Sequence, residues 1–185
     1  MISSELLKNS LIILSEGFWI LSNWSQFRRI FTRNNKGLSA PTQTLNAAGN
    51  IAWITYFSSK SLMVPTATNA INFFITLFTL AYVLGNKKQF FKGIIAIIVI
   101  SPITSYLLIS NPDISGWLAV AYNTIASTPW LFHVITTKKT SGISEKSLYL
   151  NVTATLLTAT YAILIGSGPL ILGTSLGMIT TIVIM

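Results

Sequence analysis

Long apolar runs follow one another along this chain with only short polar connections between them, and this pattern restricts the folds available to it. A helix of about 20 apolar residues matches the hydrocarbon thickness of a bilayer. Because no water is present there to bind the backbone, a run that crosses lipid has to satisfy its own polar groups as a helix. Seven such runs are present, at 9–31, 41–59, 64–85, 93–110, 117–137, 145–165 and 168–185. The sequence therefore predicts an all-α membrane protein with seven transmembrane helices.

The composition agrees with lipid as the main solvent. Charged residues make up 9% of the chain and the mean hydropathy is +0.64, whereas an ordinary soluble domain has about 25% charged residues. The net charge of +8 comes from short clusters between apolar runs, so we expect no nucleic-acid partner. Because the chain has no Cys, a Cys-based metal site and a disulfide framework are excluded. We expect no cofactor and no metal.

The basic residues predict the orientation. Only Lys8 and Lys60 lie on one side of the predicted membrane. The other side receives Arg28, Arg29, Arg33, Lys36, Lys87, Lys88, Lys92, Lys138, Lys139 and Lys146. Since Lys and Arg accumulate in cytoplasmic connections, the N-terminus is predicted outside and the C-terminus in the cytoplasm. The first run is too long for the apolar part of a signal peptide and is expected to stay as a span. The compact connections favour a plasma (cell) membrane, and lipid is an expected partner.

The sequence also resembles itself at an offset of 105 positions. Within the windows 22–56 and 127–161, the same residue recurs at Ser22/Ser127, Phe27/Phe132, Ile30/Ile135, Thr32/Thr137, Gly37/Gly142, Ser39/Ser144, Leu45/Leu150, Asn46/Asn151, Thr55/Thr160 and Tyr56/Tyr161. Chance would give roughly two or three matches at ordinary residue frequencies. Matches of Gly, Ser, Asn and Tyr are not expected from apolar composition alone. The pattern indicates an internal duplication.

A duplicated unit of three spans has a geometric consequence. Residues 1–85 would form the first three-helix unit, 86–116 a linker with the fourth span, and 117–185 the second unit. An odd number of spans reverses the chain direction, and the single linker helix restores it. Both units then enter the membrane in the same direction, as parallel repeats in a 3+1+3 plan.

Each half carries a loop pattern that resembles the PQ-loop repeat. The second half has Pro129-Trp130 near a helix end, followed by the stretch Lys138-Lys139-Thr140-Ser141-Gly142-Ile143-Ser144. The first half has Trp24-Ser25 at the matching place, then Arg33-Asn34-Asn35-Lys36-Gly37-Leu38-Ser39. The chain is similar to SWEET-type and related PQ-loop transporters over nearly its whole length. This resemblance implies a transporter of a small polar solute, most simply a sugar, that works by alternating access.

The same resemblance implies a pocket with a Trp on the second helix of a unit and an Asn on the third. Trp53 and Asn69 match these positions, and the second half has Thr158 and Thr174 there. Asn123 and Ser175 lie at a similar predicted depth. A neutral solute would find a stacking face and polar side chains at this level. Asn46 and Asn151 are expected to hold helices together, and for Asn50 and Asn72 both roles stay open.

Two further residues are candidates for coupling and motion. Glu16 lies within the first span, and intramembrane carboxylates commonly mark ion pathways, so it is a candidate proton acceptor. Pro129 lies within the fifth span, where a missing N–H weakens the helix, and it is the predicted hinge of the second unit.

Other functions stay open at this point. One is transport of an amino acid or another metabolite, proton-coupled through Glu16. Another is a receptor or accessory subunit that binds without transport, since a fold does not fix an activity. An enzyme is not expected, because the chain has no Cys nucleophile, no paired carboxylates in the spans and no evident partner for His133. Assembly into a homo-oligomer also stays open.

Overall fold

The computed structural model describes residues 4–33, 40–84, 95, 111–137 and 144–185. Within these ranges the regular structure is entirely helical, which confirms the predicted all-α class. The helices are α1 (Ser4–Arg33), α2 (Ala40–Ser59), α3 (Met63–Leu84), α5 (Pro112–Thr137), α6 (Glu145–Ile165) and α7 (Gly168–Ile184). The predicted span 93–110, which is most of the 86–116 linker, lies outside the described residues.

The helix bounds differ from the predicted ones mainly at two starts. α1 begins at Ser4 and not at 9, and α5 begins at Pro112 and not at 117. In both cases the helix includes a polar first turn, which a search for apolar runs leaves out. Pro112 suits the first helical position, since its missing N–H has no acceptor there. The predicted boundary between 116 and 117 falls inside α5.

The short turns between helices are explained by their capping residues. Ser144 caps α6, with its hydroxyl accepting from the Ser147 N–H at 3.3 Å. Gly166 ends α6 in the left-handed conformation, at a φ of 69°, which costs glycine little. Ser167 then caps α7, and Pro169 follows in its first turn. These local signals let α6 and α7 reverse direction within two residues.

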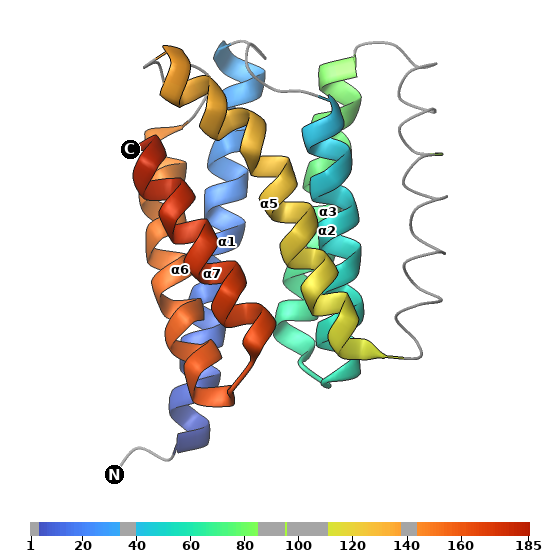
Figure 1. The fold of residues 1–185 in the computed structure, drawn as a ribbon, viewed down its shortest axis with the longest axis vertical. Coiled ribbons are helices and arrows are strands. Elements are labelled where there is room, and N and C mark those ends of the chain that lie inside the picture. The colour runs from blue at the N-terminus through green and yellow to red at the C-terminus, as the bar shows by residue number, and fades with distance from the viewer. Residues whose placement is uncertain (1–3, 34–39, 85–94, 96–110, 138–143) are drawn as a thin grey trace.

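The helices run in two directions (Figure 1). α1, α3, α5 and α7 run upward in this view, and α2 and α6 run downward. We call the end that holds the turns at 60–62 and 166–167 the turn end. The opposite end, where α1, α3, α5 and α7 terminate, is the basic end, since Arg28 and Arg29 lie near it. α5 crosses the bundle diagonally between the two ends (Figure 1).

The six described helices pack as a closed ring. α1 packs against α3 and α6, α2 against α3 and α5, and α7 against α5 and α6. Each pair of packed helices has a counterpart at the corresponding helices of the other half of the chain. The pair α1·α3 corresponds to α5·α7, α2·α3 to α6·α7, and α1·α6 to α5·α2. We call α1, α2 and α3 the first group and α5, α6 and α7 the second group. In each group, the third helix therefore lies between the first and the second. The packing is that of two equivalent three-helix groups joined along two seams, α1·α6 and α2·α5.

A buried apolar cluster closes the ring at the turn end. Its members are Ile12, Ala52, Trp53, Tyr56, Phe57, Ala119, Val120, Tyr161, Ala162 and Leu170. Tyr56 also hydrogen-bonds Ser167 between its hydroxyl and Oγ at 2.7 Å. At the surface, Lys60 Nζ lies 2.8 Å from Asp113 Oδ1, and this carboxylate raises the pKa of the lysine. The two groups are thus held together at this end by packing and polar contacts.

Hydropathy along the described helices supports the membrane prediction in part. Two segments are long and apolar enough to cross a membrane by length and composition, Met63–Tyr82 and Glu145–Ile165, and Gly168–Ile184 is a shorter apolar helix. In α1, three arginines, a lysine and two glutamates lower the mean hydropathy. In α2, Gln43, Asn46 and Asn50 have the same effect.

Candidate functional site

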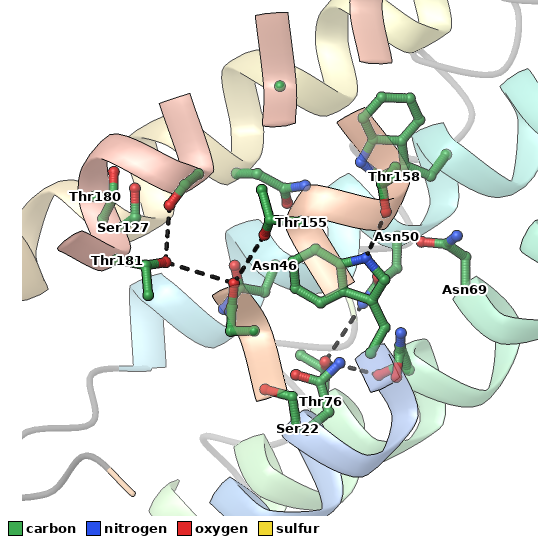
Figure 2. A pocket seen from close by; sticks show the side chains of 18 of the residues that line it. Ser22, Asn46, Asn50, Asn69, Thr76, Ser127, Thr155, Thr158, Thr180 and Thr181 are labelled. Carbon is green, nitrogen blue, oxygen red and sulfur yellow. Dashed lines mark hydrogen bonds between the residues drawn. The ribbon is translucent and has the colours of Figure 1, made fainter. Parts of the chain in front are cut away.

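A cavity of about 390 Å³ lies inside the ring, and all six described helices contribute to its wall. This volume is in the range of small-molecule sites. Figure 2 shows amide and hydroxyl side chains around it, among them Asn50 and Asn69 from the first group and Thr158 from the second. The lining reaches Gln43 and Ile184 near the basic end. Toward the turn end it stops at Phe57 and Leu170, which border the apolar cluster.

The polar lining follows the helical period. The residues concerned are Gln43, Asn46, Asn50 and Trp53 in α2, Asn69, Asn72, Thr76 and Thr79 in α3, and Asn151, Thr155 and Thr158 in α6. Spacings of three and four residues place side chains on one face of a helix. Each of these helices thus turns a polar stripe toward the cavity and its apolar residues elsewhere.

The lining also follows the sequence offset. Eleven pairs of lining residues are separated by 105 positions, and they come from all three pairs of corresponding helices. They are Trp19/Thr124, Ser22/Ser127, Gln43/Leu148, Asn46/Asn151, Asn50/Thr155, Trp53/Thr158, Asn69/Thr174, Asn72/Gly177, Ile75/Thr180, Thr76/Thr181 and Thr79/Ile184. The 105-residue offset is defined by identical residues in the sequence and is independent of the cavity lining. Corresponding positions of the two groups therefore face the same space.

The structure brings the predicted site residues together. The substrate-binding candidates Trp53, Asn69, Asn123, Thr158 and Thr174, and the coupling candidate Glu16, all line the cavity. The prediction for Ser175 was wrong, because this residue is exposed and outside the lining. Its hydroxyl donates to the Ile171 carbonyl within α7. Thr174 and Ser175 are neighbours on a helix and face different directions, so only one of them reaches the cavity.

Trp53 is held firmly at the closed side of the cavity. It is 9% exposed, and its ring stacks on Phe57 at 5.2 Å between centroids and 17° between planes. Tyr56 meets it edge-on. A side chain at Gly173 of α7 would begin 3.7 Å from the indole. Trp53 thus belongs both to the apolar cluster and to the cavity wall.

Asn123 approaches α2 where a glycine leaves room. A Cβ added at Gly49 would lie 2.3 Å from Asn123 Oδ1, closer than any real contact. Asn69 is oriented by its own helix, since its Nδ2 donates to the Pro65 carbonyl at 2.8 Å. Thr174 Oγ1 donates to the Leu170 carbonyl at 2.7 Å. Local contacts therefore fix the orientation of these side chains.

Thr158 joins the two groups through a residue that was not predicted. Its Oγ1 accepts a hydrogen bond from Trp19 Nε1 of α1 at 3.2 Å and also pairs with the Ser15 hydroxyl. Trp19 lines the cavity, so the wall has a second indole besides Trp53. The signal was present in the sequence: Trp19 lies one turn after Glu16, on the same face of a helix.

Other predicted roles have mixed outcomes. Asn46 and Asn151 were expected to hold helices together, and both also line the cavity. Asn151 Oδ1 accepts from Thr181 Oγ1 of α7 at 3.5 Å, which joins two helices as expected, and from Thr155 Oγ1 at 3.2 Å within α6. Pro129 is exposed within the continuous helix α5 and does not line the cavity. Its role as a hinge stays a prediction.

One of the described lining residues has an acidic side chain. Glu16 is the only ionisable Asp, Glu, Lys, Arg or His among the described lining residues, and it is 6% exposed. Thr68 of α3 lies beside its carboxyl group. No group of three or more His, Cys, Asp or Glu that would hold a metal is found among the residues described. The described wall therefore offers amides, hydroxyls, two indoles and a carboxyl group to a bound molecule.

A search against protein-family models finds no match for this sequence, and a search of curated proteins finds none either.

Proposed function

We propose that this protein is a membrane transporter of a small polar solute, in which two three-helix units alternately open a shared cavity to the two sides. The main support is the cavity itself, whose wall combines corresponding positions of both groups at the 105-residue offset. A site built from both groups is exposed or closed when one group tilts against the other. Transporters built from repeated units commonly achieve alternating access in this way.

The direction of the helices supports the parallel arrangement of the units. α1, α3, α5 and α7 run one way (Figure 1), so the two groups have the same orientation. A 3+1+3 plan needs an additional helix between 84 and 112, where the span 93–110 was predicted. The proposed membrane topology has the N-terminus outside and the C-terminus in the cytoplasm, as the basic residues indicate. The resemblance to SWEET and PQ-loop transporters agrees with this proposal.

The described conformation fits one state of such a cycle. The apolar cluster separates the cavity from the turn end, while the polar lining continues to the basic end. With the proposed topology, this is a state closed to the outside and facing the cytoplasm. The cluster and the Tyr56–Ser167 hydrogen bond would have to separate before the cavity opens outward.

The first experiment identifies a ligand. The purified protein in detergent is screened by thermal shift against sugars, amino acids and other polar metabolites at two pH values. A ligand that binds only the folded state raises its apparent stability. Ligands found in this way are then tested for uptake in proteoliposomes. Binding without flux would contradict transport and favour a receptor on the same fold.

The second experiment tests the cavity as the binding site. Trp53→Ala and Asn69→Ala should each weaken ligand binding and uptake about tenfold or more, because each removes contacts of 1–3 kcal/mol. Trp24→Ala and Asn9→Ala are matched controls, since both residues are exposed on α1 and outside the lining. Wild-type binding and uptake by both cavity variants would remove the cavity from the mechanism.

A further inference from the structure

The inference concerns the charge of the solute and rests on the proposed function. The cavity has one buried carboxyl group, Glu16, and no Lys, Arg or His among its described lining residues. The two ion pairs found in the described residues, Lys8–Glu5 and Lys60–Asp113, do not involve it. A buried carboxylate without a cation is costly, so it either holds a proton or pairs with a cation from outside the protein.

A second observation points to a ligand at the same wall. Asn72 on α3 is 8% exposed, lines the cavity, and its Oδ1 has no hydrogen-bond partner among the described residues. An unpaired buried acceptor costs about 1–3 kcal/mol. α3 packs against α1, and Thr68, one turn before Asn72, lies beside the Glu16 carboxyl group. This wall therefore offers acceptors that need donors.

The indoles add to the same preference. Trp19 follows Glu16 by one turn of α1, and Trp53 faces the cavity from α2. The face of an indole attracts cations. A solute with a carboxylate or phosphate would find only neutral donors on the described wall. The site thus favours a positive charge and gives no partner to a negative one, which disfavours an amino acid.

We propose that the solute is a small organic monocation with a primary ammonium group and no acidic group, and that its ammonium binds Glu16 and Asn72 Oδ1. The neutral remainder of the solute then meets the amides, hydroxyls and indoles of the other walls. An amino sugar and a short amino alcohol both have this chemistry.

The test uses probes that differ in charge and little else. Glucosamine, glucose and glucuronate carry an ammonium, a hydroxyl or a carboxylate on the same ring, and ethanolamine and ethylene glycol form a smaller pair. Affinities for the full-length protein are measured by thermal shift at a pH where the amines are protonated. At least one amine should bind about tenfold or more tighter than its hydroxyl counterpart, as expected for a charge-assisted hydrogen bond. Glucuronate should bind more weakly than glucose.

Two variants test which residues cause the preference for an amine over its hydroxyl counterpart. Glu16→Gln keeps size and shape but removes the charge, so amine and alcohol should then bind within about twofold of each other. Glu5→Gln is the matched control, because it makes the same change on α1 outside the cavity, and it should keep the wild-type preference. Asn72→Leu should lower amine affinity about tenfold without lowering the melting temperature of the ligand-free protein, since it removes an unpaired acceptor.

The outcomes distinguish this proposal about the charge of the solute from the proposed transport function. Uptake of a neutral probe with no preference for its amine would overturn the charge inference and leave transport standing. An amine preference that depends on Glu16, without flux in proteoliposomes, would support the charge inference and overturn transport. The absence of any amine binding to the wild-type protein would overturn the inference, as would an amine preference that survives Glu16→Gln.

Discussion

Because Gly116 has no side chain, α5 can pack closely against α2 and α7 at the turn end. A Cβ added there would lie 2.9 Å from Pro169 Cβ on α7 and 3.0 Å from Tyr56 Cδ2 on α2. Pro169 and Tyr56 are both buried, so neither has free space to move into. The close approach of α5 to its two neighbours in the ring therefore depends on glycine at this position.

Gly116→Ala is expected to destabilise the protein by about 1–3 kcal/mol, as overpacking usually does. The measurement is the melting temperature in detergent. Gly17→Ala is the control, because a Cβ at this exposed helical position meets nothing within 4 Å, and Ala is the better helix former. Equal melting temperatures for Gly116→Ala and the wild type would contradict the packing described.

Individual site residues were predictable only in part. Trp53 and Asn69 were identified by resemblance, and Glu16 by its charge within an apolar run. Trp19 was missed because tryptophan in a span is also common at membrane interfaces. Whether it reaches the cavity depends on the rotation of α1 about its axis. That rotation is set by packing against α3 and α6, which a single apolar run does not encode.

At the scale of the element, α5 is a continuous helix from Pro112 to Thr137 with a proline inside it. Pro129→Ala returns an N–H to the helix interior, where proline costs about 3 kcal/mol relative to alanine. We expect a higher melting temperature and, if α5 bends during transport, slower uptake of any solute identified above.

Pro112→Ala is the matched control for this substitution. The N–H at the first helical position has no acceptor within the helix, so little stability is gained. If Pro112→Ala raises the melting temperature as much as Pro129→Ala does, the gain does not come from restoring an N–H in the interior of α5.

The seam between α1 and α6 contains several hydrogen bonds. Ser22 Oγ lies 2.9 Å from Ser147 Oγ, Ser25 Oγ lies 3.1 Å from Ser144 Oγ, and Gln26 Oε1 accepts from the Ser144 N–H at 2.9 Å. With the contacts of Ser15 and Trp19 to Thr158, they extend from the middle of α1 to the basic end.

Because the chain has no Cys, this seam can be tested without removing native thiols. Ser22→Cys combined with Ser147→Cys should form a disulfide under mild oxidation, seen by mass spectrometry after proteolysis. Ser22→Cys with Ser175→Cys should not, since Ser175 is exposed outside the cavity lining. Efficient cross-linking of the second pair in monomeric protein would contradict the ring.

The elements were easier to predict than their packing. The apolar runs with Gly166 and Ser167 between them predict the bounds of α6 and α7 accurately, because helix capping depends on local sequence. The starts of α1 and α5 were placed too late, since their first turns are polar. The order of helices around the ring follows from contacts between distant segments, and only the duplication pointed to a relation between the two groups.

At the scale of the whole molecule, the proposed orientation makes a separate prediction. Ser61→Cys at the turn end should react with a membrane-impermeant maleimide added to intact cells. Lys146→Cys at the basic end should react only after permeabilisation. Both residues are exposed, so access is set by the membrane. The reverse labelling pattern would contradict the N-outside topology and make the described conformation outward-facing.

The two groups correspond in position but not in chemistry. Asn69 and Asn72 correspond to Thr174 and Gly177 in the lining, and Glu16 corresponds to Ala121, which is outside the lining. The cavity therefore lacks the two-fold equivalence that a pair of identical units would give it. A solute with two unlike ends then has one preferred orientation, whereas two identical units would offer it two equivalent ones.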